Sequence, residues 1–515
     1  MKTLSKLCGF SAVAMLTALS GNAYSQSVIE IDQNSTIGVI EPEVYGQFVE
    51  HLGGGIYDGL WVGADSDIPN TDGIRDDVFA ALDKLSVPVM RWPGGCFADY
   101  YRWRDGVGDR ADRPVRINVN WGGAREPNQF GTHEFFNLAE RLGSKTYLNI
   151  NLGTGTVGEA KDWLEYITSD ADAALANERR ENGRSEPWVV DYLSVGNETW
   201  GCGGNLRPGA YADLYAQYMT FAKTANAQPV RIISGSHDGN IDYSDAILDH
   251  PAMGSLAEGI SVHFYTLPTS DWSDKGPATG FAEDQWASTI ERSLRINDIV
   301  KSQIDMIDAN EVGEDFKLYV DEWGMWTNQE DGAADGSLYQ QNTIRDAVVA
   351  AIHLNVFHAY ADRVPMTNIA QMVNVLQAMI LTDGPDMLLT PTYHVYEMYI
   401  PFQGATSIPI SVESPAYKFE DISVDALSVS AAKNAEGSII LSLVNTDPNH
   451  SHPVVLPDMS GTITSARVLS GDAMDAHNTF EHKARVTPQT LAVTMNGDGL
   501  NTDLPPHSVA VIIVE

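Results

Sequence analysis

Two acidic residues in this sequence follow similar apolar runs. Glu198 comes after the run that ends at Val195, and Glu322 comes after the run that ends at Val320. An acid placed in this way is typical of a carboxylate at the carboxyl end of a buried parallel strand, where α/β barrels carry their chemistry. Two carboxylates across one cavity suit cleavage of a glycosidic bond, because one can protonate the leaving oxygen while the other attacks or activates water. A single acid of this kind could instead cap a strand or pair with an arginine, so the prediction depends on both placements together.

The segments around these acids alternate between strand-like and helix-like patterns. We expect strands at 44–50, 87–92, 145–151, 189–198, 230–236, 260–265, 317–322 and 364–369. We expect helices at 76–85, 134–142, 157–168, 207–225, 289–306 and 343–360. This alternation predicts an α/β fold, a (β/α)₈ TIM barrel. Glu198 would then close the fourth strand and Glu322 the seventh, so that both face one cavity.

After about residue 401 the apolar segments become short, alternating and separated by turns. Segments 438–444, 464–469, 486–493 and 509–514 are examples, and the pattern predicts a jelly-roll-like C-terminal β-sandwich. Segment 27–40 also contains an alternation with a period of two, and we expect it to join the sandwich. The predicted division is a signal peptide at 1–25, an N-terminal strand at 26–43, a catalytic barrel at 44–400 and the sandwich at 401–515.

The composition excludes some partners. The chain has 69 acidic and 32 basic residues, for a net charge of −37. A surface of this charge repels nucleic acid and anionic lipid, so we expect neither nucleic acid nor a membrane as a partner. Residues 1–25 have Lys2 and Lys6 before a short apolar run and a small-residue cleavage pattern at Ala23–Ser25. This is typical of a signal peptide, so we expect an exported protein, either periplasmic or secreted.

The chain has three cysteines, and Cys8 would leave with the signal peptide. Cys96 and Cys202 alone make no disulfide framework, and without clustered histidines they are a poor metal set. We therefore expect no metal and no other cofactor. We also expect the two cysteines to stay unpaired unless the fold brings them together.

Further polar and aromatic groups follow the predicted strands. Tryptophans follow strand ends at Trp61, Trp103, Trp200, Trp323 and Trp326. Because sugars stack on aromatic faces and need many hydrogen bonds, these positions favour a sugar-binding cleft, although any one tryptophan could simply pack in the core. Arg91, Arg102 and Arg104 could bind an acidic group or orient carboxylates in the barrel, which would keep a nucleophile ionised.

At these residues the sequence resembles glycoside hydrolase family 51, the α-L-arabinofuranosidases of the retaining clan A barrels. The resemblance covers about residues 45–399. It rests on the motifs Tyr45-Gly46-x-Phe48-x-Glu50-His51, Arg91-x-Pro93-Gly94-Gly95, Trp103-x-Asp105-Gly106-x-Gly108, Gly196-Asn197-Glu198, Asp321-Glu322-Trp323, and Asn368 through Gln371 to Asn374. Together these motifs are specific, whereas Asn-Glu alone would indicate only the wider clan.

The resemblance implies an exo-acting α-L-arabinofuranosidase that releases terminal arabinofuranosyl residues from arabinoxylan, arabinan or their oligosaccharides by double displacement. It implies that Glu198 is the acid/base, that Glu322 is the nucleophile and that Asn197 binds the hydroxyl beside the anomeric carbon. The other implied substrate-binding residues are Glu50, Cys96, His263, Tyr265 and Gln371. Cys96 stands where many members carry Asn, and a thiol is a weaker hydrogen bonder. The resemblance also implies a homo-oligomer, a trimer or hexamer.

Two other functions remain open from the sequence. A related clan A glycosidase, such as an endo-β-glucanase or a β-xylosidase, could share the scaffold, because loops rather than strands set the subsites. A non-catalytic glycan-binding protein is the second alternative, but it should have lost one of the two acids, and both are present.

Overall fold

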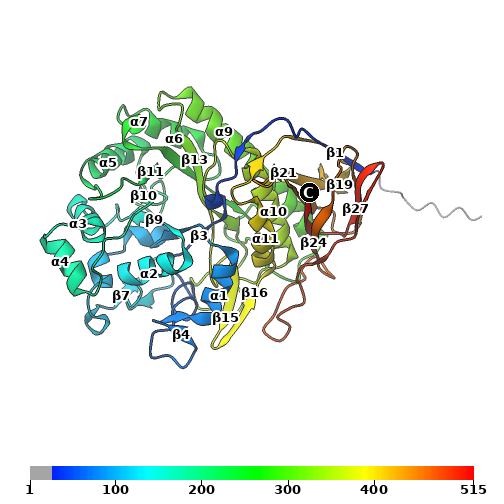
Figure 1. The fold of residues 1–515 in the computed structure, drawn as a ribbon. Helices are drawn as coiled ribbons and strands as arrows, with labels where there is room; N and C mark the ends of the chain where they lie inside the picture. The colour runs from blue at the N-terminus through cyan, green and yellow to red at the C-terminus, as the bar shows by residue number, and fades with distance from the viewer. Residues whose placement is uncertain (1–25) are drawn as a thin grey trace, which may run out of the picture.

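The computed structural model describes residues 26–515, and eight parallel strands form the closed barrel of its larger domain, on the left in Figure 1. In chain order the strands are β3 (Gly46–Phe48), β6 (Val89–Trp92), β9 (Lys145–Ile150), β10 (Tyr192–Val195), β11 (Val230–Ile233), β12 (Gly259–Thr266), β13 (Lys317–Met325) and β14 (Thr367–Ile369). Neighbouring strands follow chain order, and β14 pairs with β3 to close the ring. The predicted barrel is therefore confirmed, with β10 fourth and β13 seventh.

Helices surround the barrel, and amphipathic helices such as α1 and α2 bury an apolar face. The helices are α1 (Asp76–Leu85), α2 (Thr132–Leu142), α3 (Val157–Thr168), α4 (Ala174–Glu181), α5 (Pro208–Phe221), α6 (Ile241–Leu248), α7 (Met253–Leu256), α8 (Glu283–Ser293), α9 (Arg295–Ala309), α10 (Ile344–Ala359) and α11 (Pro391–Tyr399). The single helix expected at 289–306 is instead α8 and α9, which meet at Leu294. Leu294 keeps a helical backbone (φ −67°, ψ −18°). The spacing of apolar residues therefore continues from α8 into α9, and the sequence pattern does not show that there are two helices.

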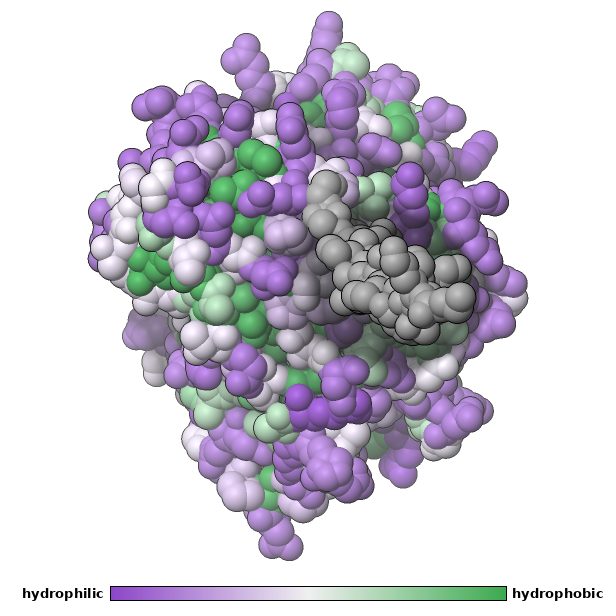
Figure 2. Space-filling model, turned by 90° about the vertical axis from the view of Figure 1, so that its right-hand side faces the viewer, coloured by the Kyte–Doolittle hydropathy of each residue, from purple (hydrophilic) through white to green (hydrophobic). Residues whose placement is uncertain are grey.

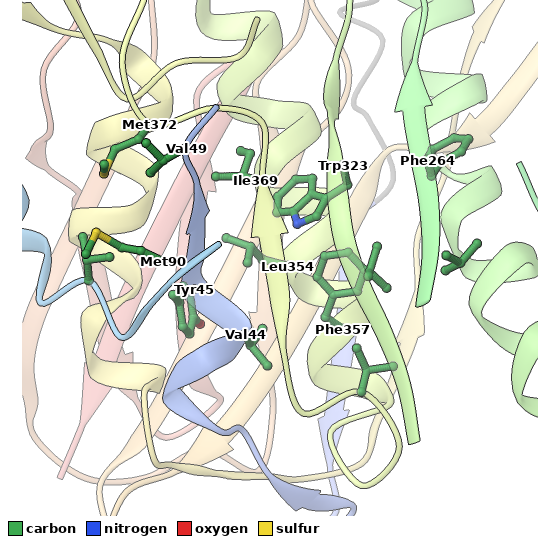
Figure 3. Close-up of a cluster of buried hydrophobic side chains, with 14 of the residues drawn as sticks. Val44, Tyr45, Val49, Met90, Phe264, Trp323, Leu354, Phe357, Ile369 and Met372 are labelled. Carbon is green, nitrogen blue, oxygen red and sulfur yellow. The ribbon is translucent and has the colours of Figure 1, made fainter. Parts of the chain in front are cut away.

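Helix α10 links the barrel to the second domain. Figure 3 shows Leu354 and Phe357 of this helix in one apolar cluster with Trp323 of β13. On its other side, the His358 ring is hydrogen bonded to Tyr45 (Nε2 to Oη, 2.7 Å) and to Ser430 of the sandwich (Nδ1 to Oγ, 2.7 Å). The two domains are therefore packed closely through this helix.

The C-terminal domain is a β-sandwich of two sheets with the strand orders β18-β1-β23-β27-β26 and β2-β17-β21-β22-β28-β24-β25. Its strands are β1 (Ser27–Ile31), β2 (Gly38–Val39), β17 (Thr406–Ser407), β18 (Ile410–Glu413), β21 (Leu427–Lys433), β22 (Ile439–Asn445), β23 (His452–Leu456), β24 (Ile463–Leu469), β25 (Gln489–Thr490), β26 (Val493–Asn496), β27 (Gly499–Leu504) and β28 (Ser508–Val514). The expectation that the N-terminal segment joins the sandwich is confirmed, but the segment forms two strands, one in each sheet. The continuous strand expected at 486–493 is wrong, because the chain leaves one sheet after β25 and enters the other sheet at β26.

The visible surface is mainly hydrophilic. Figure 2 shows one face covered largely by hydrophilic residues, with apolar residues in small scattered patches. Among residues 26–515, no helix is long and apolar enough to cross a bilayer. The predicted signal peptide, residues 1–25, lies outside the residues that the structure describes.

Candidate active site

A cavity of about 370 Å³ opens at the carboxyl ends of the barrel strands. Most of the residues that the sequence singled out for chemistry line it: Glu50, Cys96, Glu198, His263, Tyr265, Glu322 and Gln371. Aromatic side chains from the loops form a further part of its wall: Trp121, Trp200, Trp272 and Trp326. The fold therefore brings the predicted acids together with a sugar-sized, aromatic-lined space.

Glu198 lies in a turn directly after β10. Gly196 has φ +77° and Glu198 itself has φ +43°, a left-handed conformation that is uncommon for residues other than glycine. The carbonyl oxygen of Glu198 accepts hydrogen bonds from the N–H groups of Gly201 (2.7 Å) and Gly203 (3.2 Å). The turn brings a carboxylate oxygen of Glu198 to within 4.8 Å of one of Glu322. Two carboxylates from strands three steps apart in the ring therefore lie across a short gap from each other.

Glu322 is held by two donors. The Tyr265 hydroxyl donates to Oε1 (2.7 Å), and Arg91 Nη1 donates to Oε2 (3.0 Å). Arg91 also donates through Nη2 to Oδ1 of Asn197 (2.5 Å), and its guanidinium lies over the ring of Phe48 at 4.5 Å. One buried arginine therefore positions both the Glu322 carboxylate and the amide next to Glu198.

His263 lies between three carboxylates. Its Nδ1 is 2.9 Å from Glu198 and 3.5 Å from Glu322, and its Nε2 is 3.1 Å from Oδ1 of Asp321. Burial alone would lower the pKa of His263, but the charges and hydrogen bonds of these carboxylates raise it to about 10. Burial raises the pKa of Asp321, but Arg91 and His263 outweigh it and hold that pKa at about 2. The imidazole is therefore a cation, hydrogen bonded to Glu198 through Nδ1 and ion-paired with Asp321 through Nε2.

We expect a His263→Gln variant to lose less stability than the wild type when the pH is raised. The folded-state pKa of His263, about 10, is above its unfolded value of about 6.5. Its contribution to the free energy of unfolding is therefore complete below about pH 6.5 and lost as the pH rises through 10. Denaturant unfolding of both proteins at pH 6.5 and pH 9.5 measures the free energy of unfolding of each. The contributions of groups that titrate in both proteins cancel when the value of the variant is subtracted from that of the wild type. A difference that does not change with pH would contradict the assignment of a charged His263.

Glu50 is buried at one end of the cavity. Its Oε1 accepts hydrogen bonds from the Phe97 N–H (2.9 Å) and from Trp121 Nε1 (3.1 Å), and its Oε2 accepts one from Gln371 Nε2 (3.1 Å). Burial, followed by the negative charge of Glu322, raises the pKa of Glu50 to about 7. Glu50 and Gln371 thus present a paired carboxyl and amide to the cavity, a pattern suited to sugar hydroxyls.

Cys96 and Cys202 form a disulfide, with Cα atoms 5.6 Å apart. The fold therefore brings the two cysteines together, and they form the pair that the sequence left open and did not favour. Cys96 starts η2 (Cys96–Asp99), which lies against the loop that follows Glu198, and nothing in the sequence spacing reveals that proximity. Cys96 does line the cavity, but as a disulfide sulfur without an S–H donor. The Sγ of Cys202 lies 3.8 Å from Oε2 of Glu198, so the bridge forms a wall beside this acid.

The three arginines that the sequence grouped are separated in the structure. Arg91 is in the site, Arg104 pairs with Glu178 at 2.7 Å on the surface, and Arg102 is exposed. Of the five tryptophans considered, Trp200 and Trp326 line the cavity, and the others are buried in the core. Sequence reasoning missed seven lining residues in irregular loops, where no periodic pattern indicates position: Leu52, Trp121, His237, Asp238, Trp272, Leu338 and Leu376.

Comparison with known proteins agrees with this geometry. The model of the α-L-arabinofuranosidase 1 domain matches residues 81–274, and that of the α-L-arabinofuranosidase C-terminal domain matches residues 321–508. A Bacteroides ovatus protein named intracellular exo-α-L-arabinofuranosidase is 43% identical over 98% of both chains. A probable α-L-arabinofuranosidase C of Aspergillus flavus is 31% identical over 94% of this chain and 96% of its own.

Solved structures give the same result. The family 51 arabinofuranosidase from Xanthomonas axonopodis pv. citri superimposes with a TM-score of 0.92 at 40% identity, covering 95% of this chain and all (100%) of its own. An α-L-arabinofuranosidase from Thermotoga maritima, solved as an arabinose complex, superimposes with a TM-score of 0.80 at 28% identity over 95% of this chain and 100% of its own. These matches span both the barrel and the sandwich.

One expectation from the sequence is contradicted by these comparisons. The Bacteroides ovatus relative, which aligns with 98% of this chain, is named an intracellular enzyme. The prediction of an exported, periplasmic or secreted protein is therefore wrong. Two lysines before a short apolar run are weak evidence for a signal peptide, because the pattern depends on composition alone.

The family models, the relatives and the solved structures all name the activity that the resemblance implied, and it is a glycosidic bond cleavage of the kind that the paired carboxylates suggested. The relatives cover nearly the whole chain at up to 43% identity. The chain therefore belongs to glycoside hydrolase family 51, a family of α-L-arabinofuranosidases.

Proposed function

We propose that this enzyme releases terminal α-L-arabinofuranosyl residues from arabinoxylan, arabinan or their oligosaccharides, with Glu322 as nucleophile and Glu198 as acid/base. The observation that carries the proposal is the gap of at most 4.8 Å between oxygens of the two carboxyl groups. Retaining glycosidases hold their carboxyl groups about 5–5.5 Å apart, whereas inverting enzymes leave about 6.5–9.5 Å for a water. The short gap supports double displacement with retained configuration.

In the first step, a Glu322 oxygen attacks the anomeric carbon and forms an arabinosyl ester. The bond to the leaving oxygen breaks, and Glu198 transfers its proton to that oxygen. Glu198 becomes negatively charged as it does so. The His263 imidazolium, whose Nδ1 lies 2.9 Å from Oε1 of Glu198, stabilises that charge.

In the second step, Glu198 removes a proton from a water molecule, and the resulting hydroxide attacks the anomeric carbon. The ester bond breaks, and Glu322 leaves as a carboxylate. Arg91 and the Tyr265 hydroxyl, which hydrogen bond to its two oxygens, stabilise the departing charge. Two inversions at the same carbon give net retention.

The remaining residues of the cavity would bind the arabinose ring. Glu50 and Gln371 offer acceptor and donor groups to its hydroxyls from one end of the cavity. Asn197 is fixed through Oδ1 by Arg91 and has its Nδ2 group 3.9 Å from Sγ of Cys202, and we assign this Nδ2 group to the hydroxyl next to the anomeric carbon. The Cys96–Cys202 bridge gives an apolar surface against which the ring can pack.

The test uses aryl glycosides and proton NMR. We expect the α-L-arabinofuranoside to be cleaved at least about 100-fold faster than the β-xyloside or β-glucoside, since a pocket that hydrogen bonds one sugar rejects others by factors of this size. The arabinose first seen in the NMR spectrum should be the α anomer. A β anomer would overturn the retaining mechanism, and a preference for xyloside or glucoside would favour the related glycosidases over this specificity.

A further inference from the structure

Asp99 is a buried acid beside the active site that the proposed chemistry does not use. It is the last residue of η2 and is 1% exposed. Its Oδ1 accepts hydrogen bonds from the N–H groups of Leu152 and Gly153, both at 2.8 Å, and its Oδ2 accepts one from the N–H of Asn197 at 3.0 Å. One carboxylate therefore joins the end of β9 to the end of β10.

The third of these bonds reaches the residue directly before Glu198. The peptide that follows Asn197 leads into the left-handed backbone of Glu198, at φ +43°. L-residues rarely adopt this conformation, so contacts around the turn must hold it. Because the Asn197 N–H is fixed by Asp99, the orientation of that turn depends on the Asp99 carboxylate.

Gly203 shows how closely the carboxylate and the turn are packed. A Cβ atom added at Gly203 would lie 3.0 Å from Oδ2 of Asp99 and 2.0 Å from the carbonyl oxygen of Asn197. There is no room for a side chain between them. The other end of η2 is attached to the same loop, since Cys96 is bonded to Cys202. Segment η2 therefore holds the turn of Glu198 at two points.

We propose that Asp99 is a positioning residue for the general acid/base, and that it fixes the turn that directs the Glu198 carboxyl group to the leaving oxygen. This inference rests on the proposed function, since it takes Glu198 to be the acid/base. Asp99 does not line the cavity, so it acts through the backbone of Asn197 and Glu198 and not by contact with the sugar.

The test is an Asp99→Asn variant, which keeps the shape of the side chain. An amide has one acceptor oxygen and one donor nitrogen, so it can accept from the β9 end or from Asn197 but not from both. We would measure kcat/KM for aryl α-L-arabinofuranosides whose phenols differ in pKa. A poor leaving group needs a proton from Glu198, whereas 2,4-dinitrophenolate leaves without one.

We expect Asp99→Asn to lower kcat/KM by about 100-fold for the phenyl arabinofuranoside, within the range of general acid catalysis, and by less than about 5-fold for the dinitrophenyl compound. Azide, which needs no general base, should accelerate turnover of the dinitrophenyl substrate. An equal loss across the series, with no effect of azide, would overturn the proposal, because a merely structural defect does not depend on the leaving group. Asp99→Ser, which is smaller and introduces no clash, should give the same pattern and serves if the Asn variant does not fold.

Two controls separate the possible failures. Glu198→Ala must show the same dependence on leaving group; if it does not, the proposed function fails. If Glu198→Ala shows the dependence and the Asp99 variants do not, only the positioning role fails. Asp191→Asn is the matched control, since Asp191 also joins β9 to β10 through a backbone bond, from the N–H of Thr146 (2.9 Å), but at the opposite end of these strands. Its leaving-group dependence should equal that of the wild type.

Discussion

A Glu322→Gln variant should lose about 10⁴-fold or more in kcat and keep its fold. The amide has nearly the same shape as the carboxylate, and its oxygen can still accept the hydrogen bond from Tyr265. It is not negatively charged, however, and cannot form the arabinosyl ester, so the first step loses its nucleophile. Losses of this size are typical when a covalent nucleophile is removed. Steady-state kinetics with an activated aryl α-L-arabinofuranoside measures the loss, and thermal unfolding checks the fold.

Two further variants make this prediction specific. Glu50→Gln changes another buried carboxyl group that lines the same cavity. Because this group is assigned to sugar binding, the variant should raise KM by a larger factor than it lowers kcat. In Glu322→Ala, azide can occupy the vacated space and attack from the nucleophile's side. The product should then be the β-L-arabinofuranosyl azide, with inverted configuration. Near-normal turnover by Glu322→Gln, or an azide product of retained configuration, would contradict the assignment of Glu322.

The strands of the barrel could be predicted because parallel strands buried on both faces are continuous apolar runs. Their ends were less certain. The fourth strand was expected to reach Glu198, but β10 ends at Val195, because Gly196 turns the chain with a positive φ. Side chains alone do not indicate such a turn. The error did not move Glu198 to another strand, so the pairing with Glu322 remained correct.

Other parts of the site could not be predicted from one sequence. The Cys96–Cys202 bond joins loops that follow different strands, and only the folded barrel brings them together. Trp121 reaches Glu50 from a hairpin of β7 (Arg116–Asn118) and β8 (Ala124–Glu126), where no apolar period applies. Asp99 has the appearance of an ordinary loop acid. Its burial against three backbone N–H groups is a property of tertiary structure.

Arg91→Lys should lower kcat/KM by at least about 100-fold although it keeps the positive charge. The guanidinium is 1% exposed and serves Glu322 and Asn197 with separate nitrogens, with Nε 3.7 Å from Asp321. A lysine has one nitrogen on a flexible stem and cannot donate to Glu322 and Asn197 from two nitrogens held in one plane. Misplacement of catalytic groups by about 1 Å can cost 10²-fold in rate. Kinetics on the aryl arabinofuranoside would measure the loss. If Arg91→Lys had the activity of the wild type, the paired donation by the guanidinium would not be required.

Arg91→Met tests the charge instead of the geometry. It leaves the carboxylates of Asp321 and Glu322 buried without their arginine, and breaking a buried ion pair in this way costs about 3–5 kcal/mol of stability. Arg179→Lys is the control, because Arg179 is also fully buried (0% exposed) but donates to backbone carbonyl groups such as those of Tyr166 and Ser169. That variant should lose stability in denaturant unfolding and retain kcat/KM. If Arg91→Lys lost activity only in proportion to stability, as Arg179→Lys should, Arg91 would be a structural residue, and the orientation of Glu322 would depend on Tyr265 alone.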